Sequence, residues 1–198
     1  MNRQGRNGLF RGSKATVDPI ISLESIESIK KLLANEKRNL FLFVLGINNG
    51  LRAGDLLKLR VSDFIQAKPN ELIHIKESKT GKTNYITLNK SAYKIFQSYM
   101  DYESLHADDF LFKSRKGNTP LTIQAVNRLI KKWCKTINLP GNYGAHTLRK
   151  TFGYIQRTKY GVGFEVLCKR FNHSSPAVTM RYLGISDTEV ANILKNEI

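Results

Sequence analysis

The chain has 198 residues, of which 41% are hydrophobic, and this suits one folded domain with a real core while excluding a wholly disordered chain. Lysine and arginine number 32 against 16 aspartates and glutamates, so the formal net charge is +16. Such an excess favours a polyanionic partner, above all nucleic acid, although membrane-binding and ribosomal proteins can also be basic. The greasiest stretch, residues 40–47, is far too short to span a bilayer, so no membrane partner is expected.

The N-terminal region combines glycines with arginines and a lysine and contains no acid. This composition predicts a flexible basic arm or linker over residues 1–17, although a disordered end without a role fits it about as well. No apolar run marks a secretory signal, and a cytoplasmic location is expected. Cys134 and Cys168 form no Cys-x-x-Cys pair, which favours free, buried thiols in a reducing cytosol.

Hydrophobic periodicity predicts a mainly helical chain with one hairpin. An amphipathic helix begins at Ser22, and a more buried helix runs from about Lys37 to Asn48, where Asn49-Gly50 ends it. Strands are predicted over residues 72–76 and 85–88, on either side of a glycine-containing turn with two lysines. The other predicted helices cover residues 51–59, 91–102, 122–137, 147–159, 164–171 and 187–198.

Titratable side chains are concentrated between residues 144 and 184. His146 and Arg149 are three positions apart, so they share one face of a helix. Ser175 and Pro176 form an N-cap followed by proline at the first helical position, and this helix carries Tyr182 near its end. Imidazoles, guanidinium groups and a phenol gathered in this way suit the attack of a tyrosine on a phosphodiester.

Six positions, in chain order, resemble the motifs of the catalytic domain of the tyrosine recombinase (phage integrase) family. They comprise the arginine of Gly-Leu-Arg-Ala-Gly-Asp, the lysine of the hairpin turn, a His-x-x-Arg pair, a second histidine and a tyrosine: Arg52, Lys79, His146, Arg149, His173 and Tyr182. The resemblance implies an α+β fold that is mainly α-helical, with a small antiparallel sheet. It places the catalytic domain at residues 18–185, followed by a C-terminal docking helix over residues 186–198.

The resemblance also implies an activity and a partner. The expected function is site-specific recombination of double-stranded DNA, through strand cleavage and rejoining with a 3′-phosphotyrosyl intermediate. The protein is expected to act as a homo-oligomer, a tetramer, on DNA, and the family suggests that the C-terminal helix is exchanged between protomers. Docking of that helix within its own protomer is at least as good an interpretation for a free monomer. No cofactor is implied, and no residue cluster resembles a metal site.

The chemistry of the side chains supports these roles. Arginine stays charged and its planar fork can hold two phosphate oxygens, so Arg52 and Arg149 suit the charge of a five-coordinate transition state. A tyrosine with a pKa near 10 is only about 0.1% phenolate at neutral pH, so Tyr182 needs help. His146 is the candidate proton acceptor, and His173 is expected to hydrogen-bond a non-bridging oxygen. Lys79 is the candidate general acid for the leaving 5′-oxygen.

Some neighbouring residues leave alternatives open. Lys82 lies on the same turn as Lys79 and could exchange roles with it. Asp55 is expected to orient the Arg52 region, and Arg181 to face phosphate or solvent. The two histidines outside the motifs, His74 and His106, are expected to be structural.

The chain departs from the family pattern in two places. Asn172 stands where glycine commonly precedes the second histidine, and asparagine is the residue after glycine that best tolerates a left-handed turn. The N-terminal DNA-clamping domain has no counterpart, which suggests either a catalytic fragment or a short recombinase. Two rival functions remain: a non-catalytic DNA-binding module that keeps the fold, and a type IB topoisomerase-like activity.

Overall fold

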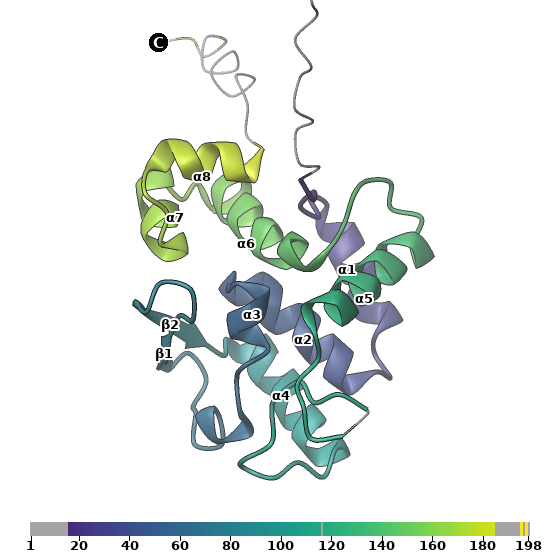
Figure 1. Ribbon diagram of the computed structural model, residues 1–198. Helices are drawn as coiled ribbons and strands as arrows, with labels where there is room; N and C mark the ends of the chain where they lie inside the picture. The colour runs from purple at the N-terminus through teal and green to yellow at the C-terminus, as the bar shows by residue number, and fades with distance from the viewer. Residues whose placement is uncertain (1–15, 116, 185–194, 196, 198) are drawn as a thin grey trace, which may run out of the picture.

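The computed structural model describes residues 16–115, 117–184, 195 and 197, which form helices and one two-stranded sheet (Figure 1). The helices are Leu23–Leu32 (α1), Lys37–Asn49 (α2), Ala53–Leu56 (α3), Lys90–Tyr102 (α4), Ile123–Thr136 (α5), Ala145–Tyr160 (α6), Phe164–Phe171 (α7) and Pro176–Leu183 (α8), with a 3₁₀ turn at Val61–Asp63 (η1). The strands Leu72–Lys76 (β1) and Thr83–Thr87 (β2) pair antiparallel. The predicted fold class is therefore confirmed. The predicted C-terminal helix, except for residues 195 and 197, and the basic arm up to residue 15 lie outside the described residues.

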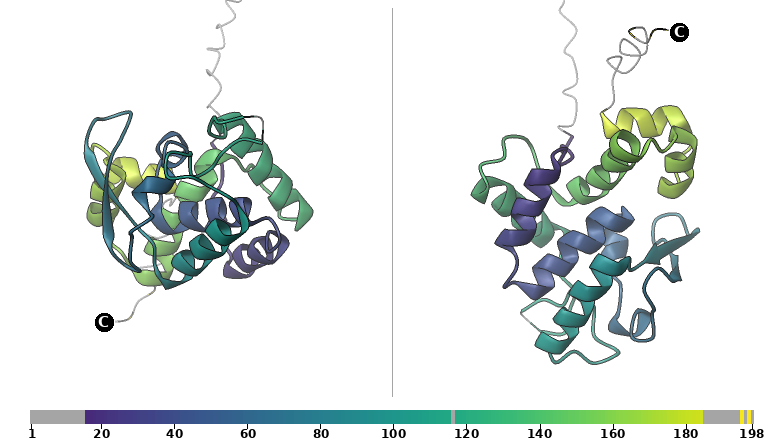
Figure 2. Two further views of the ribbon diagram at one scale, coloured as in Figure 1. Left: turned by 90° about the horizontal axis from the view of Figure 1, so that it is seen from below. Right: turned by 180° about the vertical axis from the view of Figure 1, so that it is seen from behind.

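Helix α2 forms the centre of the core and packs against both α4 and α6 (Figures 1 and 2). Its residues 41–45 are fully buried, as expected for a helix that is apolar around its whole circumference. Gly50 ends the helix with φ 59°. This left-handed conformation costs glycine little free energy because glycine has no Cβ atom. The turn that follows places Arg52 directly before α3.

The hairpin carries Lys79 at an exposed turn. Lys76 pairs with Thr83, so β2 begins two residues before the predicted start at Tyr85. The Glu77 amide donates to the Lys82 carbonyl at 3.0 Å, which closes the turn just beyond the last strand pair. The predicted turn is therefore confirmed with a slightly longer second strand.

Helices α6, α7 and α8 lie above α3 and the hairpin in the view of Figure 1, and α7 and α8 pack at the C-terminal part of α6 (Figure 2). Gly153 permits this close approach, since a Cβ atom there would lie 2.7 Å from Leu183 Cδ2 and 2.8 Å from Phe171 Cζ. Helix α8 begins as predicted: the Ser175 hydroxyl accepts from the Val178 amide at 3.3 Å, and proline occupies the first turn.

The segment of residues 16–20 is hydrogen-bonded to the start of α6. The Asp18 amide donates to the Asn142 carbonyl at 2.7 Å, and the Asp18 carbonyl accepts from the Thr147 hydroxyl at 2.8 Å. The Ile20 amide donates to the Thr151 hydroxyl at 2.8 Å. The chain therefore enters the domain beside the helix that carries His146 and Arg149.

Two predicted helix boundaries were wrong. The helix predicted over residues 51–59 covers only Ala53–Leu56, because the chain then extends to form an isolated bridge between Arg60 and Phe110. Helix α6 begins at Ala145 rather than at Thr147. The side chain of Asn127, on α5, accepts from the Ala145 amide at 2.5 Å and so caps the helix from a distant part of the sequence.

Both cysteines are free, as expected. Cys134 is buried, and burial raises the pKa of its thiol to about 12. Cys168 is only partly buried, and its thiol donates to the His173 carbonyl at 3.3 Å. In the part of the chain that the structure describes, no helix combines the length and the apolarity needed to cross a membrane.

Candidate active site

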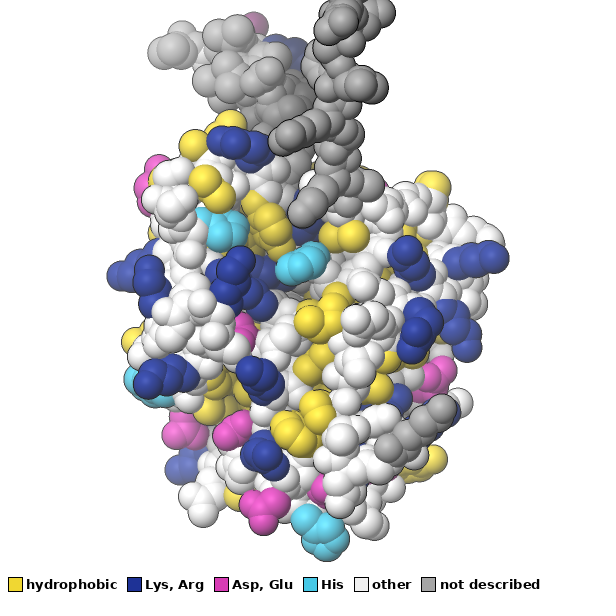
Figure 3. All heavy atoms as spheres, viewed as in Figure 1, with side chains coloured by type: hydrophobic (Ala, Val, Ile, Leu, Met, Phe, Trp, Pro, Cys, Tyr) yellow, Lys and Arg dark blue, Asp and Glu magenta, His cyan; other side chains and the backbone are white. Residues whose placement is uncertain are grey.

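The six candidate residues come from three regions that face one another across the molecule (Figure 1). Arg52 precedes α3 and Lys79 lies in the hairpin turn, whereas α6, the turn after α7, and α8 supply the others: His146, Arg149, His173 and Tyr182. Figure 3 shows Lys and Arg side chains gathered over the hairpin side of this face, with histidine side chains beside them. The site is therefore assembled from segments far apart in the sequence.

Arg149 is buried and fixed by two backbone carbonyls. Its guanidinium group donates from Nη1 to the Gly50 oxygen at 2.6 Å and from Nη2 to the Phe171 oxygen at 2.7 Å. It also lies over the Phe171 ring, 4.4 Å from the centroid. Burial lowers the pKa of Arg149 to about 10, so the group remains charged at neutral pH.

Arg52 approaches the same carbonyl from the other side of the site. Its Nη2 donates to the Phe171 oxygen at 3.3 Å, and its Nη1 donates to Glu77 Oε2 at 2.5 Å. Two guanidinium groups thus converge on a single oxygen atom. This shared carbonyl holds two positive charges side by side, in an arrangement fixed before an anionic group arrives.

Glu77 is a site residue that the sequence analysis did not predict. Its carboxylate is completely buried and accepts from Arg52 and from the Thr80 hydroxyl, the latter at 2.8 Å. Asn84 donates to its other oxygen at 2.7 Å. Burial by itself would raise the pKa of this carboxyl, but hydrogen bonds from Thr80, Asn84 and Arg52 lower it to about 2. The available signal was an acid two positions before the motif lysine, in a hairpin that is otherwise basic.

Arg170 was also missed, and it joins the two sides of the site. From the end of α7 its Nε donates to the Asn49 carbonyl at 3.1 Å, and its Nη1 donates to the Tyr85 carbonyl at 2.7 Å. Nη1 also donates to Asn84 Oδ1 at 2.5 Å. Burial lowers the pKa of Arg170. The side chain therefore connects α7 to both α2 and β2.

His173 lies against the candidate nucleophile. Its ring centroid is 5.1 Å from that of Tyr182 and 5.2 Å from that of Phe171, and its Nδ1 is 3.0 Å from Thr179 Oγ1. Burial and, secondarily, the charges of the two site arginines lower the pKa of His173 to about 4. The imidazole is therefore neutral at physiological pH.

Tyr182 presents a buried hydroxyl that has no hydrogen-bond partner among the described residues. Burial raises the pKa of this phenol, and Arg149 opposes the rise through its charge and through a contact with the hydroxyl too poor in geometry to count as a hydrogen bond, with the charge of Arg52 adding to the effect. A further residue missed in the sequence, Lys150, is buried with its ammonium group 5.2 Å from the Tyr182 ring centroid. A buried polar atom without a partner is costly and needs an explanation, and a catalytic role is one such explanation.

Lys79 is exposed and His146 retains substantial exposure although its imidazole is partly covered, in contrast to the buried Arg149. Partial burial of the imidazole and the charges of Arg149 and Lys150 lower the pKa of His146, and Lys79 adds to this effect from the hairpin. The structure therefore places the turn lysine within electrostatic range of His146, on the open side of the site. Lys82 is exposed on the same turn.

Two supporting residues were anticipated in part. Asn172 ends α7 in the left-handed conformation, with φ 50° and ψ 42°, so it replaces glycine without a change of backbone. Asp55 accepts from the Ser78 amide at 2.8 Å and therefore orients the hairpin rather than Arg52 itself. Its Oδ2 atom is buried without a partner among the described residues.

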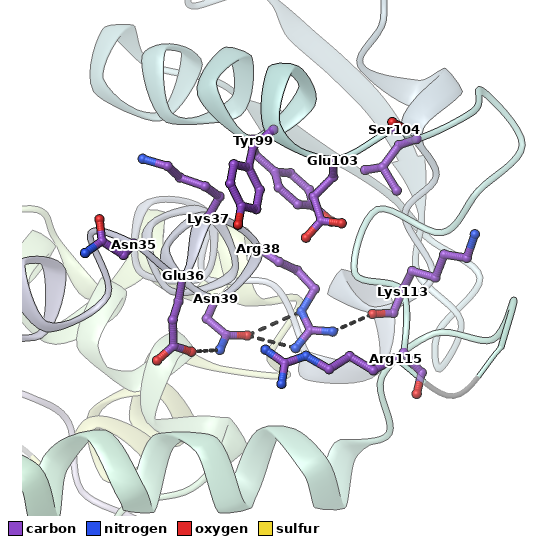
Figure 4. A pocket seen from close by; sticks show the side chains of 13 residues that line it. Asn35, Glu36, Lys37, Arg38, Asn39, Tyr99, Glu103, Ser104, Lys113 and Arg115 are labelled. Carbon is purple, nitrogen blue, oxygen red and sulfur yellow. Dashed lines mark hydrogen bonds between the residues drawn. The ribbon is translucent and has the colours of Figure 1, made fainter.

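A separate cavity of about 380 Å³ lies at the other end of α2, between its first residues, the end of α4 and the segment after Phe112 (Figure 4). Its polar groups bond to one another. Arg38 donates to Asn39 Oδ1 and, at 2.7 Å, to the Lys113 carbonyl, while Asn39 donates to Glu36. These contacts hold the segment after Phe112 against α2, and we assign the cavity a structural role.

No metal-binding chemistry is evident in the described residues, which contain no group of three or more His, Cys, Asp or Glu side chains able to hold an ion. The positive charge of the site comes from arginine and lysine. The arrangement can bind an anionic tetrahedral group between two guanidinium groups, with neutral imidazoles and a phenol at hand.

Comparison with known proteins agrees with this chemistry. Residues 21–189 match the phage integrase family. The chain is 39% identical over 174 residues to the probable integrase/recombinase YoeC of Bacillus subtilis, across 86% of this chain and 91% of that protein. It is 25% identical over 183 residues to the TnP I resolvase of Bacillus thuringiensis, across 90% of this chain but 61% of the resolvase.

Solved structures share the fold at low sequence identity. The XerA recombinase superposes with a TM-score of 0.75 at 20% identity, over 94% of this chain and 68% of that one. The XerH recombinase, in a post-cleavage complex with its palindromic difH substrate, gives a TM-score of 0.71 at 19% identity, over 93% of this chain and 55% of that one. With the match over residues 21–189, the chain belongs to the phage integrase family of tyrosine recombinases.

Proposed function

We propose that this chain is a site-specific DNA recombinase that cleaves and rejoins strands through a covalent bond between Tyr182 and a 3′-phosphate. The observation that carries the proposal is the buried, unpaired Tyr182 hydroxyl beside two arginines that converge on one oxygen atom. The charges of Arg149 and Arg52 both act on Tyr182, so a scissile phosphate bound by these two arginines would lie close to this hydroxyl.

In the cleavage step, Tyr182 Oη attacks phosphorus and the bond from phosphorus to the 5′-oxygen breaks. The phenolic proton passes to His146, which is neutral because its pKa is lowered. The 5′-oxygen leaves as a hydroxyl after taking a proton from Lys79. Attack of a 5′-hydroxyl on the phosphotyrosine reverses these transfers and rejoins DNA, so the cycle consumes no external energy source.

The arginines and His173 stabilise the charge that develops on the non-bridging oxygens. We assign His173 Nδ1 as an acceptor from the Thr179 hydroxyl, because this 3.0 Å contact is shorter than the 3.5 Å contact from that hydroxyl to the Ser175 carbonyl. A neutral imidazole in this tautomer carries its proton on Nε2, where it can donate to phosphate. The same hydrogen bond orients the ring beside Tyr182.

The two rival functions are less well supported. A non-catalytic DNA-binding module would have no need for the complete set of side chains, nor for the Tyr182 hydroxyl without a partner. A topoisomerase-like activity uses the same cleavage chemistry. Relatives of this chain are named as an integrase/recombinase and a resolvase, which favours recombination as the main activity.

We further propose that the substrate is double-stranded DNA and that four copies of the chain assemble on it in the cytoplasm. The net charge of +16 supports DNA binding. The XerH neighbour was solved bound to its DNA substrate, which supports the same partner. Exchange of the C-terminal segment between protomers would couple the placement of Tyr182 to assembly.

Covalent trapping tests the activity without knowledge of the target site. We would incubate the chain with a pool of random-sequence duplexes that each carry a nick near the centre, so that a released short strand cannot religate. The expected result is recovery of protein covalently joined to 3′ ends, both with and without a chelator. Tyr182→Phe should form no such complex, and attachment that persists in this variant would refute Tyr182 as the nucleophile.

A further inference from the structure

Glu77 is bonded to three separate parts of the active site. Among the described residues, it is the carboxylate that contacts a motif arginine, and its own side chain is fully buried while that of Arg52 is 19% exposed. It lies two positions before Lys79 in the same hairpin. A buried carboxylate in an arginine-rich, phosphate-binding site weakens the local positive potential, so its presence needs an explanation.

We propose that Glu77 is a positioning residue that holds the phosphate-binding edge of Arg52 and the turn that carries Lys79 in one fixed arrangement. This role rests on the proposed function, in which Arg52 binds the scissile phosphate and Lys79 protonates the leaving oxygen. Glu77 itself does not touch the DNA.

The first connection is to Arg52. Its Nη1 donates to Glu77 Oε2, whereas its Nη2 makes a longer contact of 3.3 Å with the Phe171 carbonyl. The ion pair therefore fixes one edge of the guanidinium fork, and the other edge, held only by the long contact to Phe171, is the one that we assign to the phosphate. A long side chain that is ordered in advance loses less entropy when the substrate arrives.

The second connection is to the hairpin turn. The oxygen that accepts from Arg52 also accepts from the hydroxyl of Thr80, the residue next to Lys79, at 2.8 Å. The Glu77 carbonyl accepts from the Gly81 amide at 2.9 Å, which holds the backbone of the turn. One carboxylate oxygen thus ties the catalytic arginine to the neighbour of the catalytic lysine.

The third connection runs to the segment that carries the Phe171 carbonyl. Glu77 Oε1 accepts from Asn84 at 2.7 Å, and Asn84 Oδ1 accepts from Arg170 at 2.5 Å. Arg170 directly precedes Phe171 in the chain. The carboxylate is therefore linked, through two side chains, to the point where both motif arginines converge.

A purely structural role would be the neutralisation of clustered arginines, without any effect on their placement. The leaving group of the DNA separates the two roles. When sulfur replaces the 5′-bridging oxygen, the strand leaves as a thiolate, which needs no proton because thiols are far more acidic than alcohols. With the 5′-sulfur substrate, a cleavage rate that fell because the lysine was displaced should therefore recover. A rate that fell because the arginine was displaced should not recover.

The experiment measures single-turnover cleavage of a nicked duplex, recovered by the covalent trapping above, in 5′-oxygen and 5′-sulfur forms. Thr80→Val removes the link from Glu77 to the turn, together with the longer 3.3 Å contact from the Lys82 amide to the same hydroxyl, and leaves the link to Arg52. We expect a loss of about tenfold with oxygen and none with sulfur. Glu77→Gln weakens the link to the turn and also the link to Arg52. A displaced catalytic group costs up to about 10²-fold, so we expect a loss of about 10²-fold with oxygen that sulfur restores only in part.

Lys79→Met is the reference for complete restoration by sulfur. Thr80 is exposed, so Thr80→Val is expected to fold even if Glu77→Gln does not. The positioning role is overturned if either variant cleaves the oxygen substrate as the unchanged protein does. It is also overturned if the cleavage rate of each variant falls by the same factor on the oxygen and sulfur substrates, and if that fall follows the decrease in melting temperature. Failure of the unchanged protein to form any covalent complex would instead refute the proposed function, and this role with it.

Discussion

The two candidate catalytic cations Arg149 and Lys79 are held in opposite ways. Arg149 is buried, and its guanidinium group donates to two backbone carbonyls from different segments. Lys79 is exposed at the tip of a two-stranded hairpin, tied to the site through the side chain of Thr80 and the carboxylate of Glu77. Arg149 is therefore part of the buried interior, whereas Lys79 lies on the surface.

This difference matches the tasks that we propose for the two groups. A residue that stabilises charge on the phosphate works best when it is fixed before the substrate arrives. A proton donor must deliver its proton and recover one during each cycle, which requires access to solvent or to a proton acceptor. The burial of Arg149 and the exposure of Lys79 therefore predict that their replacement will have different effects on stability.

The largest effect is expected for Arg149→Lys, because an ammonium group keeps the charge but cannot span the two carbonyls. We expect cleavage to fall by about 10²–10³-fold and the free energy of unfolding to fall by about 1–3 kcal/mol. Covalent trapping and denaturant unfolding measure the two quantities. Arg181→Lys, at an exposed position next to Tyr182, is the matched control and should change neither. Normal cleavage by Arg149→Lys would show that the fork geometry is unimportant.

A smaller and purely catalytic effect is expected at the hairpin. Lys79→Met should lower single-turnover cleavage by about 10²-fold, with a change in unfolding free energy within about 0.5 kcal/mol because the side chain is exposed. Lys82→Met, on the same turn, should retain cleavage within a few-fold. If the two variants behave in the reverse order, Lys82 is the general acid.

The smallest effect concerns the titration of His173. Its pKa of about 4 in the folded protein lies below its ordinary value of 6.5, so the unfolded chain binds the proton more readily between these values. The stabilising contribution is complete above about pH 6.5 and is lost as the pH falls toward 4. Urea unfolding between about pH 5.5 and 7.5 should show stability rising with pH, and His173→Gln should make the slope shallower. An unchanged slope would contradict the lowered pKa.

Local patterns were enough to predict most elements of the fold. The apolar circumference of α2, the Ser175-Pro176 start of α8 and the glycine-containing turn each depend on residues close together in the chain. The motif positions were located through the resemblance to a family rather than through physical reasoning alone. Family membership confirms that resemblance, and the roles of the individual residues remain predictions for the experiments above.

What the sequence could not predict depends on contacts between distant segments. Arg170 reaches Asn49 across 121 positions, and Glu77 reaches Arg52 across 25. In the sequence each is an ordinary charged residue on a helix or hairpin. The early start of α6 has the same origin, since its cap comes from Asn127 on another helix. Such residues are recognised only when the fold has brought their partners together.

The hydrogen bonds between residues 16–20 and the start of α6 have a mechanical consequence. The backbone of Asp18 is bonded on both its amide and its carbonyl side, to Asn142 and to Thr147, so it cannot slide along the helix without breaking these bonds. Asp18 is thus a fixed point of attachment at Thr147, the residue that directly follows His146. A load applied to the chain at that point would be transmitted directly to the helix that carries His146 and Arg149, and would reach the hairpin through α7, whose Arg170 is bonded to β2.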